Sequence, residues 1–139
     1  MKRLTDLWIR IAVVYFGVGV LMGAAMGATH NFTLRPVHVH VNLLGWVSMF
    51  LIGLLHQYLA DSLNLRLARV QFWIYQTAVP VMLLALTGLM LGHAAFEPVL
   101  GVASIAVCVS VLMLVFNVFW RSGLKTVEDG ATGTACATL

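Results

Sequence analysis

Five histidines are the residues of this sequence best suited to chemistry, at positions 30, 38, 40, 56 and 93. Imidazole is the most frequent protein ligand for metal ions, haem iron included. An ionisable side chain is costly at membrane depth, and there it usually faces a cavity, a partner or a cofactor. The alternative for each residue is an interfacial histidine that contacts lipid headgroups and water. For His30 and His93 the sequence leaves both interpretations open, whereas His56, beside Gln57 and Tyr58, is expected to be interfacial.

His38 and His40 form the sharper pattern, because they are two residues apart on one predicted helix. Two residues of an α-helix turn through about 200°, so the two imidazoles leave nearly opposite sides. They cannot chelate one ion together as an i, i+4 pair would. They can serve two different sites, one on each flank of the helix. The alternative, that both point to the membrane interface, is not excluded by spacing.

Arg35, Asn42 and Trp46 lie close to this pair and are candidates for the same site. Arg35 precedes Pro36, which favours a first helical turn, and its cation could pair with cofactor carboxylates or with lipid phosphate. Asn42 needs a hydrogen-bond partner in hydrocarbon, which a neighbouring helix could also supply. Trp46 could lie beside a planar cofactor or simply in the core.

Four apolar stretches must position these residues, at about 7–29, 38–60, 70–93 and 98–120. Hydrophobic residues make up 61% of the chain and charged residues 9%, which excludes an ordinary soluble domain. Each stretch has the ~20 residues that a helix needs to cross the bilayer, and short linkers make consecutive helices antiparallel. The sequence predicts an all-α integral membrane four-helix bundle over residues 1–121. A flexible polar tail is expected at 122–139.

Basic residues indicate the orientation, because all but Arg35 fall on one side of this topology. The positive-inside rule therefore predicts that both termini are cytoplasmic. Four aromatic residues are expected at the same inner boundary, as a belt: Trp8, Tyr58, Trp73 and Trp120. Topology explains the basic pI near 9.2, so the lipid bilayer is the expected partner and no nucleic acid is implied. Four histidines then gather at the outer face: His30, His38, His40 and His93.

Small residues recur at helical spacing on two of the predicted helices. On the first helix they form a ridge that lets helices approach closely, at Gly19, Gly23 and Gly27. On the second, one face is polar or small from His38 onward, at Asn42, Gly45, Met49, Gly53 and His56. That face suits a close helix contact or a cofactor slot.

The segment from His38 to Trp46, HVHVNLLGW, resembles the tenth transmembrane helix of subunit I in haem-copper oxidases and nitric oxide reductases. The likeness is closest to the cytochrome-c-oxidising branch with b-type haems. The chain also resembles small four-helix bacterial membrane proteins related to that subunit. By resemblance, His38 would bind a high-spin haem and His40 a low-spin haem, on opposite flanks. Haem b and the bacterial inner (cytoplasmic) membrane are the expected cofactor and location.

The resemblance also implies an assembly. Subunit I has twelve core helices in three arcs of four, so one chain would equal a third of it and a homotrimer would restore the ring. His40 of one chain could then face His38 of its neighbour, while a dimer that sandwiches haem is the rival. No motif matches the further histidines and tyrosine of the oxidase copper site. We therefore expect a non-catalytic haem protein for electron transfer, with an electron-transfer partner, or for sensing a diatomic gas.

Two other function classes stay open. The first is an outer-face copper or zinc protein without haem, which would use the four gathered histidines. The second is an accessory membrane protein whose histidines do no chemistry. Visible absorption of the purified protein would distinguish a haem protein from both of these classes. Its metal content would distinguish the copper or zinc protein from the accessory protein.

Overall fold

The computed structural model describes the backbone of residues 2–135 and the side chains of residues 2–119. This part of the chain is helical, without strands. The elements are α1 (Lys2–Thr29), α2 (Arg35–His40), the π-helix η1 (Val41–Ser48), α3 (Met49–Tyr58), α4 (Leu65–Met90), the short 3-10 helix η2 (Ala94–Phe96) and α5 (Glu97–Ala135).

The elements α2, η1 and α3 follow one another without a break, so they act as one long helix. Within the described residues, four helical segments are long and apolar enough to cross a membrane: Lys2–Thr29, Arg35–Tyr58, Leu65–Met90 and Ala94–Phe119. The predicted all-α architecture with four spans is thereby confirmed, and it is that of a multi-pass membrane protein. The first three spans begin three to five residues earlier than their apolar stretches, because polar residues at the ends still make helical hydrogen bonds, whereas α5 begins one residue earlier.

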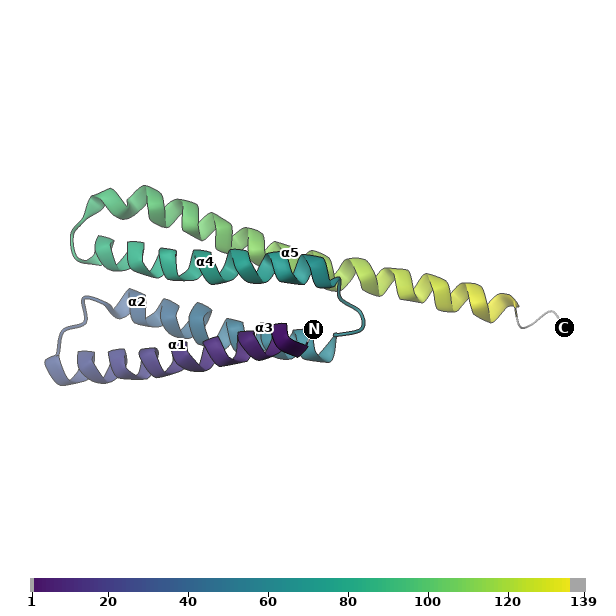
Figure 1. Ribbon diagram of the computed structural model, residues 1–139. Coiled ribbons are helices and arrows are strands. Elements are labelled where there is room, and N and C mark those ends of the chain that lie inside the picture. Colours follow the sequence, from purple (N-terminus) through teal and green to yellow (C-terminus); the bar gives the residue numbers. More distant parts are fainter. Residues whose placement is uncertain (1, 136–139) are drawn as a thin grey trace.

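The helices form two antiparallel pairs that lie side by side (Figure 1). In one pair α1 packs along η1 and α3, and in the other α4 packs along α5. Hydrogen bonds join neighbouring helices at two places. The Tyr75 hydroxyl donates to the Leu44 carbonyl at 3.1 Å, which ties α4 to η1, and the Ser110 hydroxyl donates to the Gln71 carbonyl at 3.0 Å, which ties α5 to α4.

The connection from α3 to α4 is held by two asparagines. Asn64 is the N-cap of α4, and its side-chain oxygen accepts from the backbone N–H of Arg66 at 3.0 Å. Asn117 of α5 is buried and clamps the backbone of Asn64 from the other side. Its Oδ1 accepts from the Asn64 N–H at 2.9 Å, and its Nδ2 donates to the Asn64 carbonyl at 3.3 Å.

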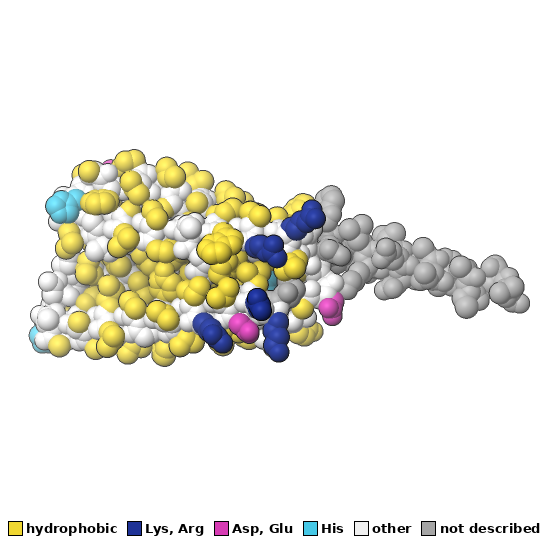
Figure 2. Space-filling model, in the orientation of Figure 1, with side chains coloured by type: hydrophobic (Ala, Val, Ile, Leu, Met, Phe, Trp, Pro, Cys, Tyr) yellow, Lys and Arg dark blue, Asp and Glu magenta, His cyan; other side chains and the backbone are white. Residues whose placement is uncertain are grey.

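Charge is distributed unevenly along the bundle. Figure 2 shows Lys and Arg side chains gathered at one end and histidine at the other. We call the end where α1 and α4 begin the basic end, and the end that carries residues 30–40 and 91–96 the histidine end. Which membrane face each end meets stays a prediction.

The predicted aromatic belt at the basic end is only partly present. Tyr58 and Trp73 are 87% and 61% exposed, as a belt requires, but Trp8 is fully buried. The prediction is therefore wrong for Trp8, which packs edge-on against Phe72 at 5.1 Å between ring centroids. The side chain of Trp120 lies outside the described residues. The same holds for the side chains of the tail at 122–139; α5 continues to Ala135, and the flexibility of the tail stays a prediction.

Candidate cofactor site

His30 and His93 lie in the connections at the histidine end. His30 follows α1 with a positive φ of 53°, and His93 precedes η2 with its ring 6.4 Å from that of Phe96. Both side chains are exposed. Among the described residues, no three His, Cys, Asp or Glu side chains come together as ligands of one ion. The four histidines share an end of the bundle, but within one chain they do not converge on a metal.

The ring of His40 is oriented by a hydrogen bond within its own helix. Its Nδ1 lies 2.8 Å from the carbonyl oxygen of Pro36, one turn earlier in α2. Because a carbonyl can only accept, Nδ1 must carry the proton, and the lone pair of the ring is then on Nε2. A histidine that ligates a metal almost always donates its other N–H in this way, since the bond fixes both tautomer and ring orientation. The ring is half-buried.

His38 is held differently, although it lies on the same short helix. The side-chain amide nitrogen of Asn42 donates to the backbone carbonyl of His38 at 2.9 Å and lies 3.4 Å from its Nδ1. The bond to the carbonyl directs the NH₂ group of Asn42, so Nδ1 is the acceptor and the proton sits on Nε2. A metal at Nε2 of His38 would require the opposite tautomer. The two histidines are therefore not equivalent.

The small face of the second span is filled by α1 of the same chain. A Cβ built at Gly23 would lie 3.0 Å from Cε1 of His38, and one built at Gly19 would lie 2.6 Å from Oδ1 of Asn42. Further along, Gly45 receives the ring of Tyr15. Of the ridge predicted on α1, Gly19 and Gly23 make close contacts, whereas Gly27 has nothing within 4 Å. The second span therefore makes a close helix contact with α1, and His38 lies against α1 in that contact.

The other two candidate residues stand at the edges of this region. Trp46 packs against Phe16 of α1, with ring centroids 4.1 Å apart and planes inclined by 35°. Arg35 is exposed, and its backbone N–H donates to the Phe32 carbonyl at 3.0 Å. No acidic side chain of the described residues pairs with it, so its guanidinium is available to an anion at the histidine end.

The π-helix directly after the histidine pair was not predicted. The sequence interpretation assumed a regular α-helix, but the structure has η1 over Val41–Ser48. π-helical segments are rare and are frequently found at functional sites. The sequence holds no local signal for this π-helix, because no residue type in it specifies the π form. One contact to it, the hydrogen bond from Tyr75 to the Leu44 carbonyl, comes from another helix, α4.

A second polar cluster lies at the basic end, and sequence reasoning missed it. His56 was predicted to be interfacial; that is wrong, because its side chain is fully buried. Its ring lies 6.1 Å from that of Trp8, and Gln71 of α4 is also fully buried. Five nitrogen and oxygen atoms of these three side chains have no hydrogen-bond partner in the described part of the protein. The only sequence signal for this cluster was that Trp8, His56 and Gln71 lie at the same end of three predicted helices.

Comparisons with known proteins assign this chain to no family. A scan against family models, a search of curated proteins and a search of solved structures each found no match to the chain.

Proposed function

We propose that this chain is a haem b-binding protein of the bacterial inner membrane that holds the haem iron through His40. Its function would be electron transfer or the sensing of a diatomic gas. The observation that carries the proposal is the hydrogen bond from His40 Nδ1 to the Pro36 carbonyl, which presents Nε2 as a ligand. The likeness of the HVHVNLLGW segment to a haem-bearing oxidase helix points to the same residue.

The surroundings of His40 suit a flat apolar cofactor. Along the same long helix, exposed apolar side chains follow at intervals of three or four residues: Leu43, Val47, Leu51 and Leu54. An apolar macrocycle against these residues would be stabilised by burial of its surface. Arg35, at the start of α2, could pair with the carboxylates of such a cofactor.

A second copy of the chain would complete the site, because His40 stands on the surface of the bundle. A trimer in which His40 meets the neighbour's His38 requires that His38 leave its contacts with Asn42 and Gly23. A dimer requires no such change if each chain contributes its His40. The arrangement therefore favours the dimer that sandwiches haem over the trimer. In it both axial positions would be filled, which favours electron transfer over gas binding.

An absorption spectrum of the purified protein, before and after dithionite, tests the proposal. We expect a strong Soret band and sharp reduced α and β bands, the mark of low-spin haem with two histidine ligands. His40→Ala should lose nearly all haem, whereas His38→Ala should retain most of it. His93→Ala, an exposed histidine at the same end, is the matched control and should leave the spectrum unchanged.

Three outcomes would refute or redirect the proposal. A colourless protein from haem-replete cells would refute haem binding, and bound copper or zinc would then favour the metal alternative. Full haem occupancy in His40→Ala would remove His40 from the site. If His38→Ala alone lost the haem, the ligand would be His38, and the tautomer argument would be wrong.

A further inference from the structure

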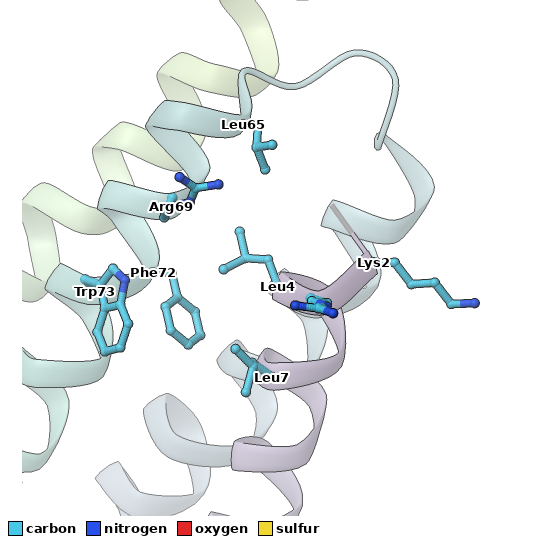
Figure 3. Close-up of a pocket in the computed structure, with 8 residues that line it drawn as sticks. Lys2, Leu4, Leu7, Leu65, Arg69, Phe72 and Trp73 are labelled. Atoms are coloured by element: carbon cyan, nitrogen blue, oxygen red, sulfur yellow. The ribbon is translucent and has the colours of Figure 1, made fainter.

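A cleft of about 480 Å³ opens at the basic end, between the first turns of α1 and α4 (Figure 3). Three basic residues line it, Lys2 and Arg3 from α1 and Arg69 from α4. All three are exposed, and none forms an ion pair with an acidic side chain of the described residues. The charges of Arg3 and Arg69 are therefore available to an anion that enters the cleft, whereas the Lys2 side chain points away from it (Figure 3).

The rest of the cleft is apolar: Leu65 lines it at the start of α4, and the other apolar residues lie deeper along the two helices. Leu4 and Leu7 line it from α1, and Phe72 and Trp73 line it from α4. Phe72 is 3% exposed and forms part of the wall, while Trp73 is 61% exposed. Trp73 thus has the interfacial position that tryptophan favours in membranes.

Charged and apolar groups follow one another in the same order on both helices. Both α1 and α4 run from the basic end toward the histidine end, and on each helix apolar residues of the cleft follow its arginine. Arg3 and Leu7 are four residues apart, as are Arg69 and Trp73, which places each apolar residue ~6 Å deeper on the same face. The helix dipoles add partial positive charge at both starts.

We propose that this cleft binds the headgroup and upper acyl chains of one anionic phospholipid. The phosphate would lie between Arg3 and Arg69, and the acyl chains would follow Leu7 and Trp73 toward the bilayer centre. A zwitterionic lipid offers no net charge to these cations, and a free phosphate would leave the apolar walls without a partner. Basic pockets between transmembrane helices bind anionic headgroups in this way.

Native mass spectrometry of the full chain in detergent, with added phosphatidylglycerol or phosphatidylcholine of the same acyl chains, tests the site. We expect phosphatidylglycerol to bind at least about tenfold more tightly. The double substitution Arg3→Gln and Arg69→Gln should remove that preference. The matched control is Arg10→Gln with Arg66→Gln, which makes the same charge change at the same end but touches residues that do not line this cleft.

Each other result overturns the proposal. Equal binding of the two lipids to the wild-type protein would show that no anionic site exists. An equal loss of the lipid preference in the cleft variant and in the control would assign the preference to the overall charge of the basic end. Asp6 contributes to that charge beside Arg3 and Arg10. Displacement of the lipid by millimolar inorganic phosphate would identify a soluble anion as the ligand. The denaturation midpoint of each variant, measured in sodium dodecyl sulfate, verifies that both remain folded.

Discussion

A single methyl group added at Gly45 tests the contact that holds α1 against η1. The Cβ introduced by Gly45→Ala would lie 2.6 Å from Cγ of Tyr15 and 3.0 Å from its Cβ. Non-bonded carbon atoms pack best at 3.5–4.0 Å, so each contact is short by roughly 0.5–1 Å. Rotation of the tyrosine ring does not move its own Cβ. The two helices must therefore separate along part of their length.

Overpacking of this kind costs about 1–3 kcal/mol, against which the loss of a helical glycine returns up to about 1 kcal/mol. We expect Gly45→Ala to lower the free energy of unfolding by about 1–2 kcal/mol. Titration of the micellar protein with sodium dodecyl sulfate, followed by circular dichroism, measures it. Gly17→Ala is the matched control: nothing lies within 4 Å of its Cβ, so this variant should be neutral or slightly more stable.

Removal of the facing ring makes the test specific. In the background of Tyr15→Ala, the cost of Gly45→Ala should fall by about 1 kcal/mol, because the ring atoms that it meets are gone. The reasoning is refuted if Gly45→Ala and Gly17→Ala unfold at the same detergent fraction. Helix α1 would then not lie against η1, and the position of His38 beside Gly23 would lose its basis.

Three further perturbations probe other parts of the molecule. Asn117→Leu removes both hydrogen bonds to the Asn64 backbone and should lower the free energy of unfolding by about 2 kcal/mol, so an unchanged denaturation midpoint would contradict the clamp. His56→Leu should leave stability unchanged or raise it by about 1 kcal/mol, because an unpaired buried polar group is destabilising; a fall would show that the imidazole is hydrogen-bonded in the folded protein. In the proposed haem complex, Arg35→Ala should lower the midpoint potential in a potentiometric titration by roughly 20 mV, the effect of a cation ~10 Å from the iron in water-like surroundings. An unchanged potential would argue against a contact with the haem carboxylates.

The spans could be predicted because hydropathy sums over about twenty residues, and no tertiary contact changes that sum. Burial could not be predicted in the same way. Lipid is as apolar as a protein core, so hydrophobicity does not distinguish the two faces of a membrane helix. Val14 and Leu21 are 66% and 72% exposed, whereas Trp8 and His56 are fully buried. The last two were assigned to the interface because their polar atoms and position near a span end are typical of it.

The histidine pair illustrates the same limit at the candidate site. Spacing alone predicts that His38 and His40 leave opposite sides of the helix, and this is sound for residues of one α-helix. Spacing does not predict which side faces α1, nor which ring nitrogen carries the proton. Those properties depend on Gly23 across the helix contact and on the hydrogen bonds to Asn42 and Pro36. The resemblance treats both histidines as ligands, whereas their hydrogen bonds distinguish them.

The π-helix links the candidate site to the core of the bundle. A π-helical segment is rarely stable by itself, so contacts from other elements must favour it over a regular α-helix. Two tyrosines supply such contacts from different helices: Tyr15 of α1 packs against Gly45, and Tyr75 of α4 donates to the Leu44 carbonyl. Tyr75 also packs against Trp8, with ring centroids 5.3 Å apart, in the buried cluster of the basic end. The direction of His40 relative to α3 and α4 therefore depends on packing one or more turns away from the residue itself. A substitution at either tyrosine would be expected to disturb a cofactor bound at His40 without touching it.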